Sequence, residues 1–265
     1  MTPAELGRIV IVIPTFNEVE NLEPIISGVR RSLPQADILV VDDDSPDGTG
    51  GLADALAAND PQVHVLHRSV KAGLGAAYLH GFEIALDRGY DVIGEMDADG
   101  SHQPEQLPSL LEALQDADLV LGSRWVPGGS VVNWPWFREA LSRGGNAYAR
   151  MVLRMPVQDA TGGFRLFRRT TLEALDLGNV ESVGYCFQVD LAWRSAQAGL
   201  RVHEVPIEFV ERTRGESKMS PSVAVESLRR ITRWGIAERR RQIRDVFSKG
   251  RGTSRTAPRD ERRTR

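Results

Sequence analysis

Short apolar runs and helical hydrophobic patterns alternate through the first half of the chain. The runs, rich in β-branched residues and typical of buried strands, cover residues 8–13, 38–41, 63–67, 91–96 and 119–122. Apolar residues at helical spacing occupy residues 17–32, the segment that begins at residue 49, and residues 75–86. Asn21 is a candidate cap of the first helix. This alternation is typical of parallel β-α-β units and predicts an α/β fold with an open, doubly wound, mainly parallel sheet.

The alternation loosens after Arg124. The sequence there predicts loops at 127–129 and 134–136, helices at 139–153 and 187–198, a short strand at 164–167, and a strand at 202–209 interrupted by Pro206. A charged loop is expected at 212–220 and a long helix at 223–247. The polar and basic residues 248–265 have a composition that is typical of disorder.

Composition narrows the class of protein. A chain of 265 residues, 41% of them hydrophobic, can bury one substantial core. Its single cysteine, Cys186, excludes an intramolecular disulfide and suits a reducing compartment; its apolar neighbours favour a buried small residue over a nucleophile. No signal peptide is recognised, and no apolar run approaches the roughly 20 residues that span a bilayer. We therefore expect a soluble or peripheral protein.

Two carboxylates one residue apart end the apolar run at residues 91–96. Asp97 and Asp99 should therefore lie at the carboxyl end of a strand, where α/β sheets bind their ligands. Paired carboxylates suit Mg²⁺ or Mn²⁺, ions that keep open positions for substrate phosphates. Such a pair also occurs in ordinary solvated loops. His102, close by, is either a ligand or base, or a structural histidine.

Two further loops follow strands at the same predicted edge. Residues 14–18 contain an aromatic side chain and Glu18, which could meet a base and a ribose, although the same residues read as a helix start. Residues 42–44 are three adjacent aspartates, either a base or ribose acceptor or a plain polar loop. Cationic side chains at Arg124, at 165–169 and at 212–218 could neutralise phosphates, or could be solvated surface charges.

Taken in order, these stretches resemble one family. The matching segments are residues 13–18, 41–49, 73–78, 96–102, 122–126, 162–165 and 212–218. Together they look like the dolichyl/polyprenyl-phosphate mannose synthases, which are inverting glycosyltransferases of the GT-A fold. On this resemblance residues 1–221 are the catalytic domain, residues 222–247 a basic amphipathic helix and residues 248–265 a disordered tail.

The resemblance implies roles position by position. The guanosine would be held by Pro14, Phe16, Glu18 and either Asp42 or Asp43. The residues expected to bind the nucleotide-sugar are Pro14, Phe16, Glu18, Asp42, Asp43, Asp97, Ala98, Asp99, Arg124, Arg212 and Lys218. Metal ligands would be Asp97, Asp99 and Ser101. Asp97, Asp99, Arg124, Arg165 and Lys218 form the implied catalytic set. Two positions depart from the family pattern: Asp44, where glycine is usual, and Gly94-Glu95, where the strand is usually more apolar.

The implied reaction transfers mannose from GDP-mannose to a polyprenyl phosphate with inversion, using Mg²⁺ or Mn²⁺. The acceptor is already an anion near neutral pH, so no strong general base is required. Residues 212–220 are expected to close over the diphosphate, with Gly215 permitting the bend and Lys218 reaching it. A polyprenyl-phosphate glucose or aminoarabinose synthase of the same fold is the alternative enzyme.

Charge sets the C-terminal part of the chain apart. Residues 222–265 contain 14 Lys and Arg against 5 Asp and Glu, within a chain whose net charge is −3. The helix at 222–247 either lies on an anionic membrane surface, with Trp234 suited to the interface, or packs its apolar stripe on the core. We expect peripheral association with the cytoplasmic face of the membrane, with room for an integral-membrane partner protein. A nucleic-acid binder is the non-enzymatic rival, but it would leave the acidic residues unexplained.

Overall fold

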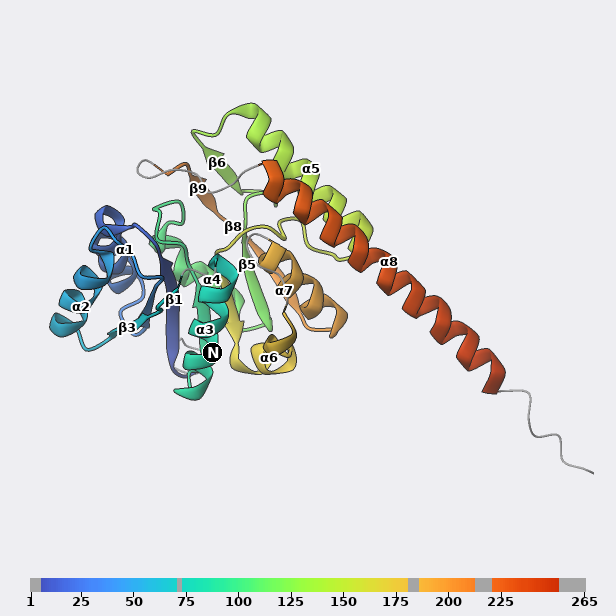
Figure 1. Cartoon of the computed structure of the whole chain (residues 1–265), viewed down its shortest axis with the longest axis horizontal. Coiled ribbons are helices and arrows are strands. Elements are labelled where there is room, and N and C mark those ends of the chain that lie inside the picture. Colours follow the sequence, from blue (N-terminus) through green and yellow to red (C-terminus); the bar gives the residue numbers. More distant parts are fainter. Residues whose placement is uncertain (1–5, 71–72, 181–185, 213–220, 253–265) are drawn as a thin grey trace, which may run out of the picture.

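A seven-stranded sheet forms the centre of the molecule. The computed structural model describes residues 6–70, 73–180, 186–212 and 221–252. The strands are β1 (Ile9–Thr15), β2 (Asp37–Asp42), β3 (Val63–His67), β4 (Val92–Glu95), β5 (Leu119–Ser123), β7 (Arg165–Arg168) and β8 (Val202–Pro206). Their order is β3-β2-β1-β4-β7-β5-β8, and only β7 runs antiparallel to its neighbours (Figure 1). The predicted α/β fold with a mainly parallel sheet is confirmed.

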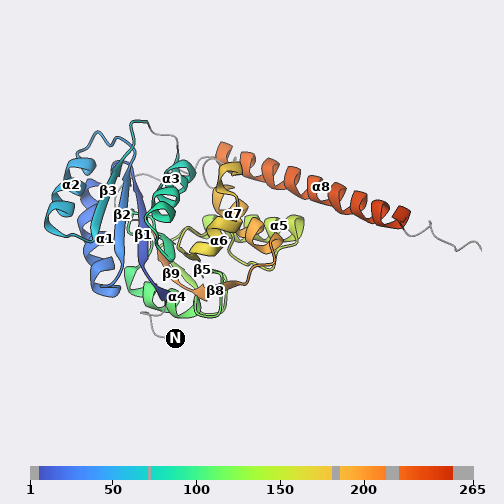
Figure 2. The same cartoon turned by 90° about the horizontal axis from the view of Figure 1, so that it is seen from below.

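Helices cover both faces of this sheet. They are α1 (Val19–Ser32), α2 (Thr49–Asn59), α3 (Leu74–Asp87), α4 (Leu107–Ala113), α5 (Trp136–Leu153), α6 (Arg169–Ala174), α7 (Cys186–Gln197) and α8 (Pro221–Gly252), with the 3-10 turns η2 (Pro104–Gln106) and η3 (Leu177–Asn179). One apolar core joins the sheet to α1, α2 and α4, and a second joins its other face to α3, α5, α6 and α7 (Figure 2). Burial on both faces explains why the strands read as continuous apolar runs.

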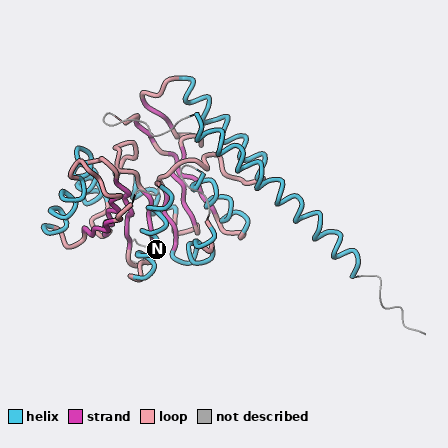
Figure 3. Tube along the Cα trace, viewed as in Figure 1, coloured by secondary structure: helices cyan, strands magenta, loops and turns pink. Residues whose placement is uncertain are grey.

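The structure corrects the predicted strand at 202–209. Pro206 lacks the N–H that a sheet ladder needs, and β8 ends there. The chain then enters a separate two-stranded sheet, in which β9 (Glu208–Val210) pairs in parallel with β6 (Ser130–Val132), as the trace in Figure 3 shows. Because β6 is short and exposed, its sequence carries no apolar run that could have revealed it.

The cap of the first helix is also corrected. Helix α1 begins at Val19, so Asn21 lies inside its first turn rather than at the N-cap. The Asn21 side-chain amide instead donates to the carboxylate of Glu18, three residues earlier, at 2.8 Å.

Helix α8 divides into a docked half and a projecting half. Ile231 is buried in the second core, the Trp234 ring stacks on Trp193 at 5.7 Å, and Tyr148 and Thr232 join their hydroxyls at 2.6 Å. Trp234 is therefore held by α7 and not free for a membrane interface. The later turns leave the body of the molecule and continue to Gly252, five residues past the predicted end (Figures 1 and 2). Among the described residues no helix is long and apolar enough to cross a membrane.

We predict that Gly235→Ala loosens α8 from α5. A Cβ at Gly235 would lie 2.5 Å from Val152 Cγ1 and 3.0 Å from the Val152 carbonyl oxygen, and the stiff Val152 has little room to yield. The expected loss of unfolding free energy is about 1–3 kcal/mol. Gly144→Ala is the matched control, since its Cβ would meet nothing within 4 Å. By denaturant unfolding that control should gain about 0.5–1 kcal/mol, and equal effects of both substitutions would contradict the packing argument.

Candidate active site

Asp97 and Asp99 lie together just beyond β4, as the sequence predicts. The Tyr78 hydroxyl donates to the Asp97 carboxylate at 2.8 Å, and the Arg212 guanidinium stands 3.0 Å from the Asp99 carboxylate. Burial raises the pKa of Asp97. Burial acts in the same direction on Asp99, but hydrogen bonding from Ser101 and the charge of Arg212 outweigh it and lower the pKa of that carboxyl. Asp99 is thus the more firmly ionised of the two.

The donor set of this pair fits a hard divalent ion. Ser101 is buried, and its backbone N–H donates to Asp99 at 3.0 Å, which orients that carboxylate. Within the described residues no group of three or more His, Cys, Asp and Glu side chains is arranged to hold a metal ion. Mg²⁺ usually takes only one or two carboxylates and completes its shell with water and substrate phosphates. Two carboxylate side chains at this edge are therefore sufficient for such an ion, and ligation by Ser101 stays a prediction.

Of the two roles that the sequence left open for His102, the structure supports the structural one. Its Nδ1 accepts the Asp97 backbone N–H at 3.1 Å, and its ring stacks on Phe164 with centroids 5.0 Å apart. Burial lowers the pKa of this imidazole, so it remains neutral. A neutral ring held in this way shapes the turn that carries the two carboxylates.

The aspartates that follow β2 are engaged within the protein. Asp42 accepts the Thr15 and Ser45 hydroxyls at 2.9 and 2.6 Å, and Asp43 forms a 2.6 Å ion pair with Arg68. Both side chains are buried. Their contact with a guanosine stays a prediction, but the geometry gives Asp42 a clear role in fixing the turn.

Asp44 fits its backbone without distortion. Its φ of 56° lies in the left-handed region, which glycine prefers and which aspartate tolerates better than most residues. The departure from the family's usual glycine is thereby explained. The glycine at position 94 has a steric reason, because a Cβ there would lie 2.6 Å from Ile11 Cδ1 and 2.8 Å from Leu166 Cδ2.

A hydrogen-bonded clamp holds the loop after β1. The backbone N–H groups of residues 17, 18 and 19 donate to the side chains of Ser45, Thr49 and Asp47 at 3.1, 3.0 and 3.2 Å. Burial raises the pKa of Asp47, but its hydrogen bonds to Thr49 and the backbone lower it further than burial raises it. The segment at residues 45–49 is thus a scaffold for the predicted nucleotide loop containing Phe16 and Glu18. The sequence showed its turn chemistry but not this partner.

Arg124 is committed to a buried ion pair. Its Nε and Nη2 atoms each lie 2.7 Å from an Asp159 carboxylate oxygen, and Nη2 also donates to Thr161 at 2.8 Å. The Asp159 backbone N–H is in turn held by Glu204 at 2.8 Å. In this structure the Arg124 guanidinium anchors the loop at residues 159–161, and no sequence pattern pointed to Asp159 as its partner. A contact of Arg124 with phosphate stays a prediction.

Arg165 is held inside the protein. Its side chain is fully buried and donates to the carbonyl oxygens of Ala160, Gly162 and Gln188 at 2.8, 2.8 and 2.7 Å. Its Nε also faces the buried Glu95 carboxylate at 3.8 Å, whose pKa burial raises to about 8. The Arg165 guanidinium has no exposed surface, so this structure gives it a scaffold role. The catalytic and phosphate-binding role expected from the sequence stays a prediction. Arg168 and Arg169 likewise hold backbone carbonyls.

Of the expected cations, the structure brings Arg212 to the carboxylates. Lys218 and the rest of the predicted closing loop lie outside the described residues. Pro14 and Ala98 are buried backbone positions beside the site, and Phe16 and Glu18 are half-buried. Tyr78, whose role no sequence pattern indicated, donates a hydrogen bond to the Asp97 side chain.

Comparison with known proteins identifies the family. The model of glycosyl transferase family 2 matches residues 10–176. An undecaprenyl-phosphate mannosyltransferase of Micrococcus luteus is 56% identical over 88% of this chain and 96% of its own. The chain belongs to glycosyl transferase family 2. A polyprenol monophosphomannose synthase of Mycolicibacterium smegmatis is 55% identical over 90% and 91% of the two chains. A dolichol-phosphate mannosyltransferase of Pyrococcus furiosus is 37% identical over 85% of this chain and 63% of its own.

Solved structures support the fold of this family 2 enzyme. Glucosyl-3-phosphoglycerate synthase of Mycobacterium tuberculosis, solved with Mn²⁺ and UDP-glucose, has a TM-score of 0.61 at 19% identity and covers 87% of this chain and 81% of its own. A mannosyltransferase of Pyrobaculum calidifontis, solved with GDP-Man and Mn²⁺, has a TM-score of 0.54 at 18% identity and covers 81% and 59%. The predicted GT-A fold, the family resemblance and the glycosyltransferase class are confirmed.

We predict that Asp159→Asn destabilises the enzyme strongly. The substitution leaves the buried Arg124 guanidinium without its counter-charge, and the expected loss is about 3 kcal/mol of unfolding free energy. Arg143→Gln, which breaks the exposed pair with Glu139, should cost under about 1 kcal/mol. Burial raises the pKa of Asp159, but the charge and hydrogen bonds of Arg124 lower it further, so the net pKa is lowered. The ion pair therefore stabilises the fold fully above the pKa that Asp159 has in the unfolded chain. This stabilisation is lost as the pH falls through the pKa of Asp159 in the folded protein. Equal losses in both variants by urea unfolding would contradict the assignment.

Proposed function

We propose that this enzyme transfers mannose from GDP-mannose to the phosphate of a polyprenyl phosphate, with inversion, giving polyprenyl-phosphate mannose and GDP. The observation that carries the proposal is identity of 56% and 55%, over nearly the whole chain, with two enzymes named for mannose transfer to such lipids. The paired carboxylates Asp97 and Asp99 support the proposal, because they follow β4 at the edge of the sheet where α/β proteins bind their ligands.

We propose that the loops after β1 and β2 bind the nucleotide. We infer that Pro14, Phe16 and Glu18 meet the guanosine, because the clamp from residues 45–49 holds this loop beside the buried Asp42 and Asp43. A solved GT-A neighbour with GDP-Man and Mn²⁺ supports GDP-mannose as the donor class.

The main catalytic requirement of this reaction is to neutralise the negative charge of the departing diphosphate. A Mg²⁺ or Mn²⁺ ion held by Asp97 and Asp99, when bound, would neutralise the departing diphosphate. Arg212, already 3.0 Å from Asp99, stands where that diphosphate would approach the carboxylates, and Lys218 would add a second cation. The acceptor phosphate is its own nucleophile. No side chain is accordingly needed as a base, and Nδ1 of His102 already accepts the Asp97 backbone N–H.

A lipid acceptor requires the enzyme to visit a membrane. We propose peripheral association with the cytoplasmic face, with the projecting half of α8 providing electrostatic attraction. Arg239, Arg240 and Arg241 are exposed on these turns, beyond the residues that dock the helix. Truncation before this segment at residue 222 would also remove the buried Ile231, so charge substitution is the cleaner test. Docking of an integral-membrane partner protein on the same helix is the alternative.

We predict that Asp99→Ala lowers transfer about 100-fold or more, because a ligand of the ion that neutralises the leaving group is lost. Asp87→Asn is the matched control: it removes an exposed carboxylate at the C-terminal end of α3, outside the candidate site. Labelled GDP-mannose, Mg²⁺ and polyprenyl phosphate are supplied, and label extracted into organic solvent is counted. UDP-glucose replaces GDP-mannose in a parallel reaction.

Three outcomes of this assay would overturn parts of the proposal. Full turnover by Asp99→Ala in excess chelator would show that the reaction needs no metal ion. Transfer from UDP-glucose but not GDP-mannose would favour the glucosyl alternative. Equal loss in Asp87→Asn would show that the effect is not specific to Asp99.

For α8, we expect the triple variant Arg239→Gln/Arg240→Gln/Arg241→Gln to bind anionic vesicles about tenfold or more weakly, since each basic residue near the surface contributes roughly 1 kcal/mol. The double variant Arg31→Gln/Arg88→Gln removes exposed charge elsewhere and should bind almost as the parent does. Sedimentation with the vesicles at low and high salt measures both. Parent binding that is insensitive to salt would exclude this electrostatic role.

A further inference from the structure

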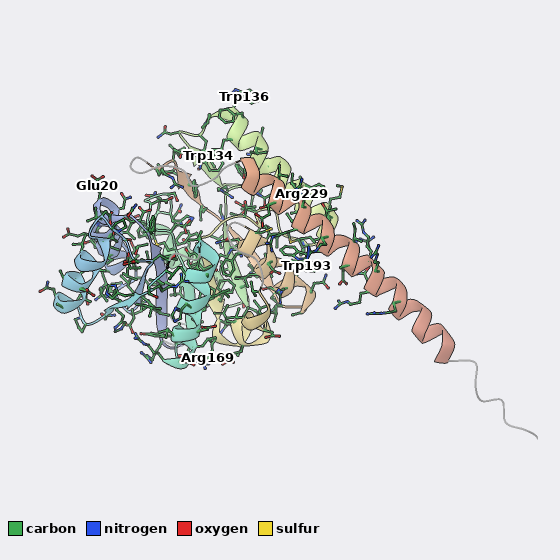
Figure 4. The ribbon with its side chains drawn as sticks, in the orientation of Figure 1. Glu20, Trp134, Trp136, Arg169, Trp193 and Arg229 are labelled. Carbon is green, nitrogen blue, oxygen red and sulfur yellow. The ribbon has the colours of Figure 1, made fainter. Side chains whose placement is uncertain are left out.

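Three large apolar side chains stand exposed on the first turns of α5. Trp136 is 80% exposed, Phe137 60% and Leu141 60%. Figure 4 shows Trp136 at the extremity of this helix, away from the body of the molecule. Neighbouring aromatic residues at this exposure are uncommon on a surface that meets only water, and such patches mark interaction sites.

Helix α8 contributes two more exposed apolar residues at the same end. Tyr148 of α5 contacts Thr232 of α8, and further along both helices Val152 lies against Gly235. The contacts advance in the same direction on both helices, so α5 and α8 run parallel (Figure 1). Val225 and Leu228, which are 46% and 42% exposed, therefore lie level with the first turns of α5.

The contacting stripes of the two helices continue into this exposed end. Leu141 precedes Tyr148 by seven residues and Val225 precedes Thr232 by seven, and seven residues make two helical turns. Side chains that would close a helix pair are thus present, yet Leu141 and Val225 stay open to solvent in the described structure. We name Trp136, Phe137, Leu141, Val225 and Leu228 the apolar tip.

Ion pairs link the apolar tip to the catalytic carboxylates. Arg138, one residue after Phe137, pairs with Glu211, and its guanidinium covers the Trp134 ring at 4.3 Å. Arg212, the residue after Glu211, pairs with Asp99 at 3.0 Å. Whatever the apolar tip contacts is therefore held close to the site of transfer.

The chemistry of the apolar tip suits the interfacial layer of a membrane. Tryptophan is enriched where hydrocarbon meets headgroups, and phenylalanine and leucine enter the acyl boundary. Arg229 on α8 is exposed beside Leu228 and matches anionic headgroups (Figure 4), whereas Arg143 of α5 pairs with Glu139 on its own helix.

We propose that the apolar tip inserts into the interfacial layer of an anionic bilayer and so sets the active site at the membrane surface. The inference rests on the proposed function in that the acceptor lipid stays in the bilayer. Insertion is distinct from attraction by the projecting half of α8: the apolar contact persists at high salt, whereas the arginine attraction is screened.

The test uses the full chain and vesicles of phosphatidylcholine with phosphatidylglycerol. Trp136→Ser/Phe137→Ser should reduce vesicle binding in high salt by about tenfold, because two aromatic side chains no longer leave water. Met151→Ser is the matched control, since Met151 is 68% exposed on the opposite end of α5, and it should bind as the parent does. Transfer to polyprenyl phosphate in vesicles should fall with binding, while transfer to a short-chain polyprenyl phosphate in detergent stays unchanged.

Unchanged vesicle binding by the double variant, with its melting temperature intact, would overturn the proposal. Loss of a dimer in sedimentation velocity without loss of vesicle binding would assign the apolar tip to a second copy and equally overturn it. Vesicle binding requires no turnover. A parent protein that binds vesicles through Trp136 but transfers no mannose would therefore refute the proposed function and leave the insertion standing.

Discussion

The buried guanidinium of Arg165 holds together the parts from which the active site is built. It sits on β7, the antiparallel strand beside β4, and faces Glu95 two residues before Asp97. Its donors hold the carbonyl oxygens of Ala160, Gly162 and Gln188, so the end of β4, the loop before β7 and helix α7 are fixed to one group. A buried guanidinium is costly unless it is hydrogen-bonded, and these three carbonyl oxygens satisfy that need for Arg165.

Most charged side chains around the crevice follow the same logic. Asp42, Asp47 and Asp159 each accept a hydrogen bond from a segment that is distant in sequence, and they hold those segments in place. The donors are Thr15, Val19 and Arg124. Asp97 and Asp99 differ, because their partners, Tyr78 and Arg212, leave a carboxylate pair suited to a divalent ion. The site is a small reactive centre inside a larger polar scaffold.

Helices α5 and α8 extend outward from this scaffold. Stacking of Trp234 on Trp193 and burial of Ile231 fix the first half of α8. The docked helix pair presents an apolar tip at one end and a basic projection at the other. The Arg138–Glu211 pair ties the tip to the residue before Arg212. A transferase whose acceptor resides in a bilayer would gain from this coupling, since membrane contact and active-site position are set by the same elements.

The sequence by itself determined the α/β class, most strands and helices of the first half, and the pairing of Asp97 with Asp99. These depend on local hydrophobic period and on the end of a strand, which a one-dimensional pattern records. The antiparallel placement of β7, the split at Pro206 and the roles of Arg124 and Arg165 depend on contacts between segments far apart in the chain. An arginine looks the same in sequence whether it meets a phosphate or a buried carboxylate. Only the tertiary structure decided between them, because burial and partner geometry arise when distant segments pack together.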